Sequence, residues 1–73
     1  MKVDIYTSKT CTYCLAAKQL MTSKGLSFRE VDLSNDQSLR LKISKQTGHR
    51  TVPQIFINNT FIGGFNELSK HLT

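Results

Sequence analysis

Two cysteines separated by two residues, Cys11 and Cys14, constrain this chain more than any other feature. An apolar run typical of a strand, residues 3–6, precedes them across a polar turn, and residues 15–21 have helical character. Cys11 is therefore expected at a helix N-terminus, where unpaired N–H groups and the helix dipole favour an anion. A thiol there is expected to ionise below its free pKa of about 8.5, and Cys14, one turn later, can form a disulfide with it. The pattern predicts a dithiol that makes and breaks disulfides.

Three other uses of the cysteine pair are less consistent with the sequence. A zinc site needs further ligands, but the chain has no third cysteine, and His49 and His71 lack the spacing of a zinc pattern. A structural disulfide across four residues would stabilise the fold little, because the entropic gain grows with loop length. Two inert core thiols do not suit a strand–turn–helix context. We predict redox use and no metal site built by the protein alone.

Length and composition predict one domain that spans residues 1–73. A chain of 73 residues is near the lower limit for independent folding, and its 38% apolar and 21% charged content is typical of a soluble globule. We see neither a signal-like stretch nor a membrane span, so we expect a cytoplasmic protein without membrane contact. The net charge of +5 arises from scattered Lys and Arg residues without interleaved aromatic residues. This pattern predicts attraction to anionic ligands or acidic proteins and no nucleic-acid binding.

The hydrophobic pattern predicts alternating short strands and helices. Expected strands are residues 2–6, 26–32, 54–57 and 61–62, and expected helices are residues 12–24, 34–47 and 65–72. Gly25 suits the left-handed residue that ends the first helix, and Ser34 and Gln37 have capping-box spacing at the start of the second. The first helix is expected to direct three larger apolar residues toward the core: Leu15, Leu20 and Met21.

The order β-α-β-α-β-β-α, with C-x-x-C after the first strand, is that of the thioredoxin fold. The initial strand–helix–strand unit should contain parallel strands joined by a right-handed crossover. Residues 54–57 are apolar enough to be covered on both faces, and residues 58–60 should form a tight hairpin turn. We predict an α/β protein with a four-stranded mixed sheet and helices on both faces.

Three blocks of sequence resemble the glutaredoxin family. The sequence Cys-Thr-Tyr-Cys at residues 11–14 resembles the family's Cys-Pro-Tyr-Cys, and residues 51–57 resemble its Thr-Val-Pro loop and the strand that follows. Residues 62–64, Ile-Gly-Gly, resemble its glutathione-binding double glycine. The blocks occur in the family's order and spacing and cover essentially the whole chain. The resemblance implies a small dithiol glutaredoxin, a glutathione-dependent thiol–disulfide oxidoreductase.

The resemblance also implies where glutathione binds as co-substrate. Pro53 would be cis and would leave the backbone of Val52 free to pair with the extended tripeptide. At the γ-glutamyl end, the N–H groups of Phe65 and Asn66 would hold a carboxylate, and Glu67 would receive the amino group. Arg40, assisted by Lys9, would bind the glycine end. The complete predicted glutathione-binding set is Lys9, Tyr13, Arg40, Thr51, Val52, Pro53, Gly64, Phe65, Asn66 and Glu67.

The implied catalytic residues are Cys11 and Cys14, acting by thiol–disulfide exchange. Cys11 would attack protein–glutathione mixed disulfides, and Cys14 would resolve the intermediate formed with a protein disulfide. The partners implied are glutathione and disulfide-containing or glutathionylated proteins, with the chain acting as a monomer.

Three departures from the family pattern keep two alternatives open. Ser8 replaces the usual basic residue, Thr12 replaces the active-site proline, and the last helix is short. Glutaredoxins without that proline include dimers that bind a [2Fe–2S] cluster with glutathione, and Cys11 would then be the ligand, although this alternative is not favoured. The second alternative is a thioredoxin-like hydrogen donor recharged by a flavoprotein reductase.

Overall fold

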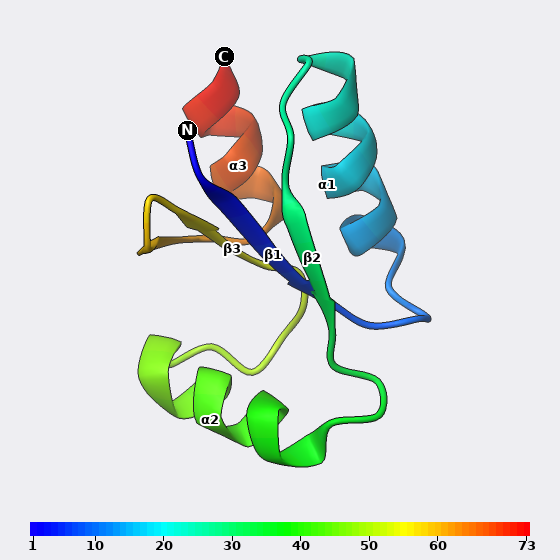
Figure 1. Ribbon diagram of the computed structural model, residues 1–73, viewed down its shortest axis with the longest axis vertical. Helices are drawn as coiled ribbons and strands as arrows, with labels where there is room; N and C mark the ends of the chain where they lie inside the picture. The colour runs from blue at the N-terminus through cyan, green and yellow to red at the C-terminus, as the bar shows by residue number, and fades with distance from the viewer.

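The computed structural model describes residues 1–73 as one four-stranded sheet with three helices (Figure 1). The elements are β1 (Val3–Thr7), α1 (Thr12–Ser23), β2 (Arg29–Asp32), α2 (Gln37–Thr47), β3 (Gln54–Ile57), β4 (Thr60–Gly63) and α3 (Phe65–Leu72). The strand order is β2-β1-β3-β4, in which β1 and β2 are parallel and the other two pairs are antiparallel. The predicted mixed sheet and element order are confirmed.

Two helices cover one face of the sheet and enclose the main core. Because side chains alternate along a strand, every second residue of β1 and β3 points to this face. The core consists of Val3, Ile5, Ala17, Met21, Ile55, Ile57 and Leu68. In Figure 1, α3 and α1 lie to the left and right of β1 and β2, and the two helices contact each other, while α2 lies at the bottom, apart from both. Leu68 of the short α3 is fully buried in this core, and Phe65 and Leu72 pack against its edge.

The opposite face of the sheet is contacted by α2. Ile43 is the buried residue of this helix, and the Thr47 hydroxyl donates a hydrogen bond of 2.9 Å to the side chain of Gln54 on β3. Phe56 on the same face packs against Tyr6 and Phe61, with ring centroids 5.6 and 5.3 Å away. Helices therefore lie on both faces, as predicted, and all four residues of β3 are buried.

The prediction that Leu15 faces the core is wrong. Leu15 is 54% exposed, whereas Met21 is fully buried and Leu20 packs at the edge of the core. The buried stripe of α1 runs through Cys14, Ala17 and Met21. Leu15 is one residue after Cys14 and so lies about 100° around the helix, away from this stripe.

Two predicted element starts also need correction. The second strand begins at Arg29, not at residue 26, because the Leu26 N–H bonds back to the Met21 carbonyl at the end of α1. The capping box at Ser34 and Gln37 is wrong, since the N-cap of α2 is Asp36, whose carboxylate accepts a 3.0 Å bond from the Leu39 N–H.

Smaller features agree with the predictions. Gly25 has the predicted left-handed conformation, with φ of +71°, two residues after α1 ends. Asn58 and Asn59 form the turn between β3 and β4 with φ of 50° and 68°. None of the three helices combines the length and the apolar character that crossing a bilayer requires.

Candidate active site

Cys11 is the N-cap of α1 and is joined to Cys14 by a disulfide. Its backbone is extended, with φ of −103° and ψ of 106°, and its sulfur accepts a 3.0 Å hydrogen bond from the Cys14 N–H. The first turn of α1 contains no acidic residue. The positive end of the helix is therefore not neutralised by a carboxylate in that turn, and in the reduced protein it favours the thiolate of Cys11.

The two cysteines differ in accessibility. Cys14 is only 2% exposed, whereas Cys11 is half-buried at the surface. An incoming sulfur can approach Cys11 but not Cys14. Cys11 is thus positioned for the first attack, and Cys14 for internal attack on Cys11.

The loop before β3 lies directly against Cys11. Its Val52–Pro53 peptide bond is cis, and the Val52 carbonyl oxygen lies 3.5 Å from the Cys11 sulfur. The Val52 N–H has no hydrogen-bond partner within the protein. An unpaired backbone donor beside a reactive sulfur can pair with an extended peptide.

Gln54, a buried polar residue at the start of β3, anchors this loop through hydrogen bonds of its side chain. Its amide nitrogen donates to the carbonyl oxygens of His49 at 2.8 Å and Thr51 at 3.1 Å, and its amide oxygen accepts from the Thr47 hydroxyl. Gln54 is 3% exposed. Because all three bonds converge on one buried side chain, Gln54 ties the loop to the end of α2.

The start of α3 closes the other side of the site. A Cβ atom on Gly64 would lie 3.3 Å from the Pro53 carbonyl oxygen, so the two segments are in close contact. The Glu67 carboxylate accepts a 2.7 Å hydrogen bond from the Gly64 N–H. This bond holds the pKa of Glu67 below its ordinary value. The N–H groups of Phe65 and Asn66 in the first turn have no partner within the protein.

These segments surround a hollow of about 390 Å³. Tyr13, 64% exposed, forms one wall, and its ring centroid is 5.9 Å from that of Phe65. The lining residues are Tyr13, Thr51, Val52, Pro53, Gly64, Phe65, Asn66 and Glu67. All eight belong to the glutathione-binding set predicted from the sequence.

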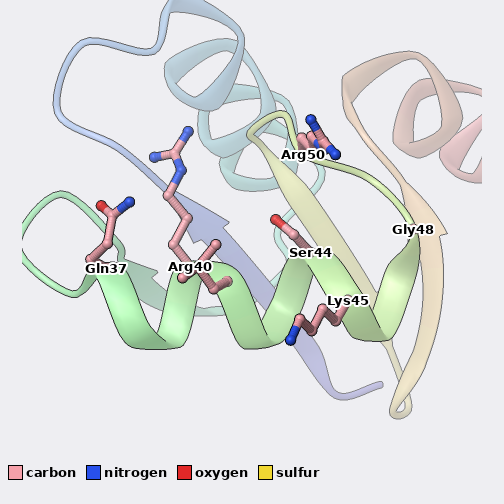
Figure 2. A pocket seen from close by; sticks show the side chains of 7 residues that line it. Gln37, Arg40, Ser44, Lys45, Gly48 and Arg50 are labelled. Atoms are coloured by element: carbon pink, nitrogen blue, oxygen red, sulfur yellow. The ribbon is translucent and has the colours of Figure 1, made fainter.

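Two members of that set lie elsewhere. The Lys9 backbone N–H donates to the Ser34 hydroxyl at 2.9 Å. Hydrogen bonds from the side chain and the backbone of Ser34 lower the pKa of Asp32, and the positive charge of Lys9 lowers it further. Arg40 is on α2 and lines a different groove (Figure 2). Their roles at the glycine end of glutathione stay predictions.

Sequence reasoning missed two residues near the site. Gln54 belongs to a predicted apolar strand, and a polar residue in a strand buried on both faces indicates a specific hydrogen-bonding role. Arg50 lies outside the predicted set and directly precedes Thr51. No group of three or more His, Cys, Asp or Glu side chains is arranged to hold a metal ion.

Comparison with known proteins agrees with this geometry. The sequence matches the glutaredoxin family over residues 3–62. The chain belongs to the glutaredoxin family. Glutaredoxin 3 of Escherichia coli (strain K12) is 47% identical over 66 residues, which cover 90% of this chain and 80% of that protein.

Solved glutaredoxin structures share the fold closely. Glutaredoxin 1 from Francisella tularensis, complexed with cacodylate, has a TM-score of 0.82 and 35% identity, covering 96% of this chain and 90% of that one. A buckwheat glutaredoxin–glutathione complex has a TM-score of 0.87 and 27% identity, covering 94% of this chain and 66% of that one. Family membership and the Cys11–Cys14 pair together support a thiol–disulfide oxidoreductase with a redox-active disulfide.

Proposed function

We propose that this glutaredoxin uses glutathione to reduce protein disulfides and protein–glutathione mixed disulfides. The observation that carries the proposal is the hollow beside Cys11, which is lined by the Val52 backbone, with its unpaired N–H, and by the N-terminus of α3. Glutathione is an extended tripeptide with two carboxylates and one thiol. The buckwheat relative, whose structure is a glutathione complex, supports the same ligand class.

The Val52 backbone would orient the cysteine of glutathione. Its unpaired N–H and its carbonyl oxygen, 3.5 Å from the Cys11 sulfur, can form two strand-like hydrogen bonds to the ligand backbone. The ligand sulfur then lies next to Cys11. Tyr13 and Phe65 would cover the remaining apolar part of the ligand.

The γ-glutamyl end of glutathione suits the start of α3. The unpaired N–H groups of Phe65 and Asn66 would bind its carboxylate at the positive end of the helix. Glu67 already accepts from the Gly64 N–H, and its other carboxylate oxygen would receive the ligand's amino group. The same helix end thus offers donors for the carboxylate and one acceptor for the ammonium.

The proposed chemistry has two branches. With a protein–glutathione mixed disulfide, the Cys11 thiolate attacks the glutathione sulfur and releases the protein thiolate. A second glutathione thiolate then attacks that sulfur, which yields oxidised glutathione and regenerates Cys11. With a protein disulfide, Cys11 first forms a mixed disulfide with the protein. Cys14 attacks the Cys11 sulfur, releases the reduced protein and leaves the Cys11–Cys14 disulfide, which two glutathione molecules reduce.

The proposal is tested by glutathione-coupled reduction of a small mixed disulfide by the wild type, Cys11→Ser and Cys14→Ser. We expect turnover to vanish in Cys11→Ser and to persist in Cys14→Ser, because the first branch needs only the accessible cysteine. Loss of protein-disulfide reduction in Cys14→Ser would support its resolving role. A folded wild type without glutathione-dependent turnover, but active with a thioredoxin reductase and NADPH, would overturn the proposal.

The proposal includes a cytosolic location. Reducing compartments keep thiols reduced through glutathione and thioredoxin, and a C-x-x-C pair there is more often catalytic than structural.

A further inference from the structure

A second depression, the α2 groove, lies beside the hollow described above. It has a volume of about 680 Å³ and is lined by Gln37, Arg40, Leu41, Ser44, Lys45, Gly48 and Arg50. Figure 2 shows Arg40 and Ser44 along one side of α2, with Arg50 reaching toward the same side from the chain that leaves the helix. Lys45 extends to the other side of α2 in this view. Two guanidinium groups and a hydroxyl thus face one open groove.

The positive charge of the α2 groove is not neutralised by the protein. The chain's two ion pairs are Lys18–Glu30 and Arg29–Asp4, and neither involves a residue of the groove. None of the five side-chain carboxylates forms an ion pair with a groove residue: Asp4, Glu30, Asp32 and Glu67 accept hydrogen bonds outside the groove, and Asp36 caps the start of α2. The groove therefore offers an attractive field to an anion from outside.

The α2 groove continues into the candidate active site along the chain. Arg50 lines the groove, and the next residue, Thr51, lines the hollow beside Cys11. Gln54 bonds the carbonyl oxygens of His49 and Thr51, on either side of Arg50. The backbone that presents Arg50 is therefore held in a fixed relation to Val52. The two surfaces therefore adjoin at residues 50 and 51.

We propose that the α2 groove docks an acidic segment of the protein substrate through Arg50, next to the disulfide that Cys11 attacks, while Arg40 stays assigned to the glycine end of glutathione. This inference rests on the proposed function. Arg side chains bind carboxylates through two parallel N–H bonds, and Ser44 and Gln37 add neutral hydrogen-bonding groups. The 56% exposed Leu41 offers an apolar contact, and the groove lacks the aromatic side chains on which nucleic-acid bases stack. A peptide with Asp or Glu residues fits this chemistry.

The test compares two glutathionylated peptides that differ only in carrying Asp and Glu, or Asn and Gln, around the modified cysteine. The proteins are the wild type, Arg50→Gln and Arg50→Lys, with Lys42→Gln as the matched control, because Lys42 is exposed on the same helix but does not line the groove. We expect the wild type to have a higher kcat/KM for the acidic peptide. Arg50→Gln should reduce that preference about two- to fivefold, the size expected for an exposed ion pair, and Arg50→Lys should restore part of it. Lys42→Gln should retain it, and high salt should abolish it.

Two results would overturn the inference while leaving the proposed function intact. One is equal kcat/KM for the two peptides in the wild type. The other is an Arg50→Gln variant whose KM for glutathione rises equally with both peptides and with a small mixed disulfide, since Arg50 would then serve glutathione itself.

Binding of the labelled, unmodified peptides, followed by fluorescence anisotropy without glutathione, separates this inference from the proposed function. If turnover is absent but the acidic peptide binds more tightly and needs Arg50, the groove assignment stands and the proposed function fails. Equal binding of both peptides would overturn the groove assignment.

Discussion

The carbonyl oxygen of Pro53 lies 3.3 Å from the point that a Cβ atom on Gly64 would occupy. The loop that carries Val52 and the first turn of α3 are therefore in contact through a position that has no side chain. Both segments line the hollow beside Cys11. Their contact fixes how the backbone of Val52 and the N-terminus of α3 are placed relative to each other in the candidate glutathione site.

Gly64→Ala should impair glutathione use more than folding. Gly64 has φ of −105°, which alanine adopts without strain, but the new methyl group would push the Pro53 carbonyl away by a few tenths of an ångström. We expect the KM for glutathione to rise about three- to tenfold, since small displacements of binding groups weaken productive alignment. Steady-state kinetics measure this effect, and urea unfolding checks stability. An unchanged KM would contradict the proposed placement of glutathione between these segments.

Gly63→Ala, unlike Gly64→Ala, should lower the stability of the fold. Gly63 has φ of +124°, and a Cβ atom there would lie 2.6 Å from the Glu67 Cγ. Both the conformation and the clash penalise alanine, so we expect a loss of about 1–3 kcal/mol in the free energy of unfolding. Urea denaturation of Gly63→Ala and Gly64→Ala measures the difference. Equal stability of the two variants would show that the backbone at residue 63 relaxes freely.

Gln54→Leu should loosen the loop that carries Val52. Leucine preserves much of the volume but removes the hydrogen bonds to Thr47, His49 and Thr51. Leaving buried polar groups without partners costs about 1–3 kcal/mol, and we expect a higher KM for glutathione as well. Urea unfolding and steady-state kinetics provide the two measurements.

Gln46→Leu is the matched control for Gln54→Leu. Gln46 is exposed on α2, so the same substitution there should change neither quantity appreciably. If the two variants are equally stable, the buried hydrogen bonds of Gln54 do not hold the loop.

The sequence predicted the features of the fold that depend on local spacing. Hydrophobic periodicity located every helix and strand, whereas the eight residues of the hollow were implied by the resemblance to glutaredoxins. Cys11 is the N-cap because a strand, a turn and a helix follow one another within a few residues. Such features follow from neighbouring residues and need no knowledge of the tertiary packing.

The errors concern choices that tertiary contacts decide. Ser34 and Asp36 are both suitable helix caps, and Asp36 occupies that position while Ser34 bonds the Lys9 N–H from a different segment. The position of Arg40 relative to the hollow also depends on how α2 lies against the sheet, and its role at the glycine end of glutathione stays a prediction. Sequence spacing carries no information on that arrangement.

Stability should fall on acidification because three carboxylates have lowered pKa values. The causes are hydrogen bonds: from Thr7 and then Lys18 to Glu30, from Ser34 to Asp32, and from the Gly64 N–H to Glu67. A carboxyl with a pKa lower in the folded than in the unfolded state binds fewer protons when folded. Its stabilisation is complete above its unfolded pKa, near 4.5 for Glu67, and is lost as the pH falls through the folded value.

Glu67→Gln should remove one part of this pH dependence. Glutamine can still accept from the Gly64 N–H, but it carries no charge at the positive end of α3 and does not titrate. We expect the variant to be less stable than the wild type at pH 7 and the difference to shrink as the pH is lowered from 7 toward 2. The free energy of unfolding in urea, measured across this range, provides the comparison. Parallel curves for the two proteins would contradict the role of the Glu67 charge, whereas a residual decline in the variant is expected, because Glu30 and Asp32 still titrate.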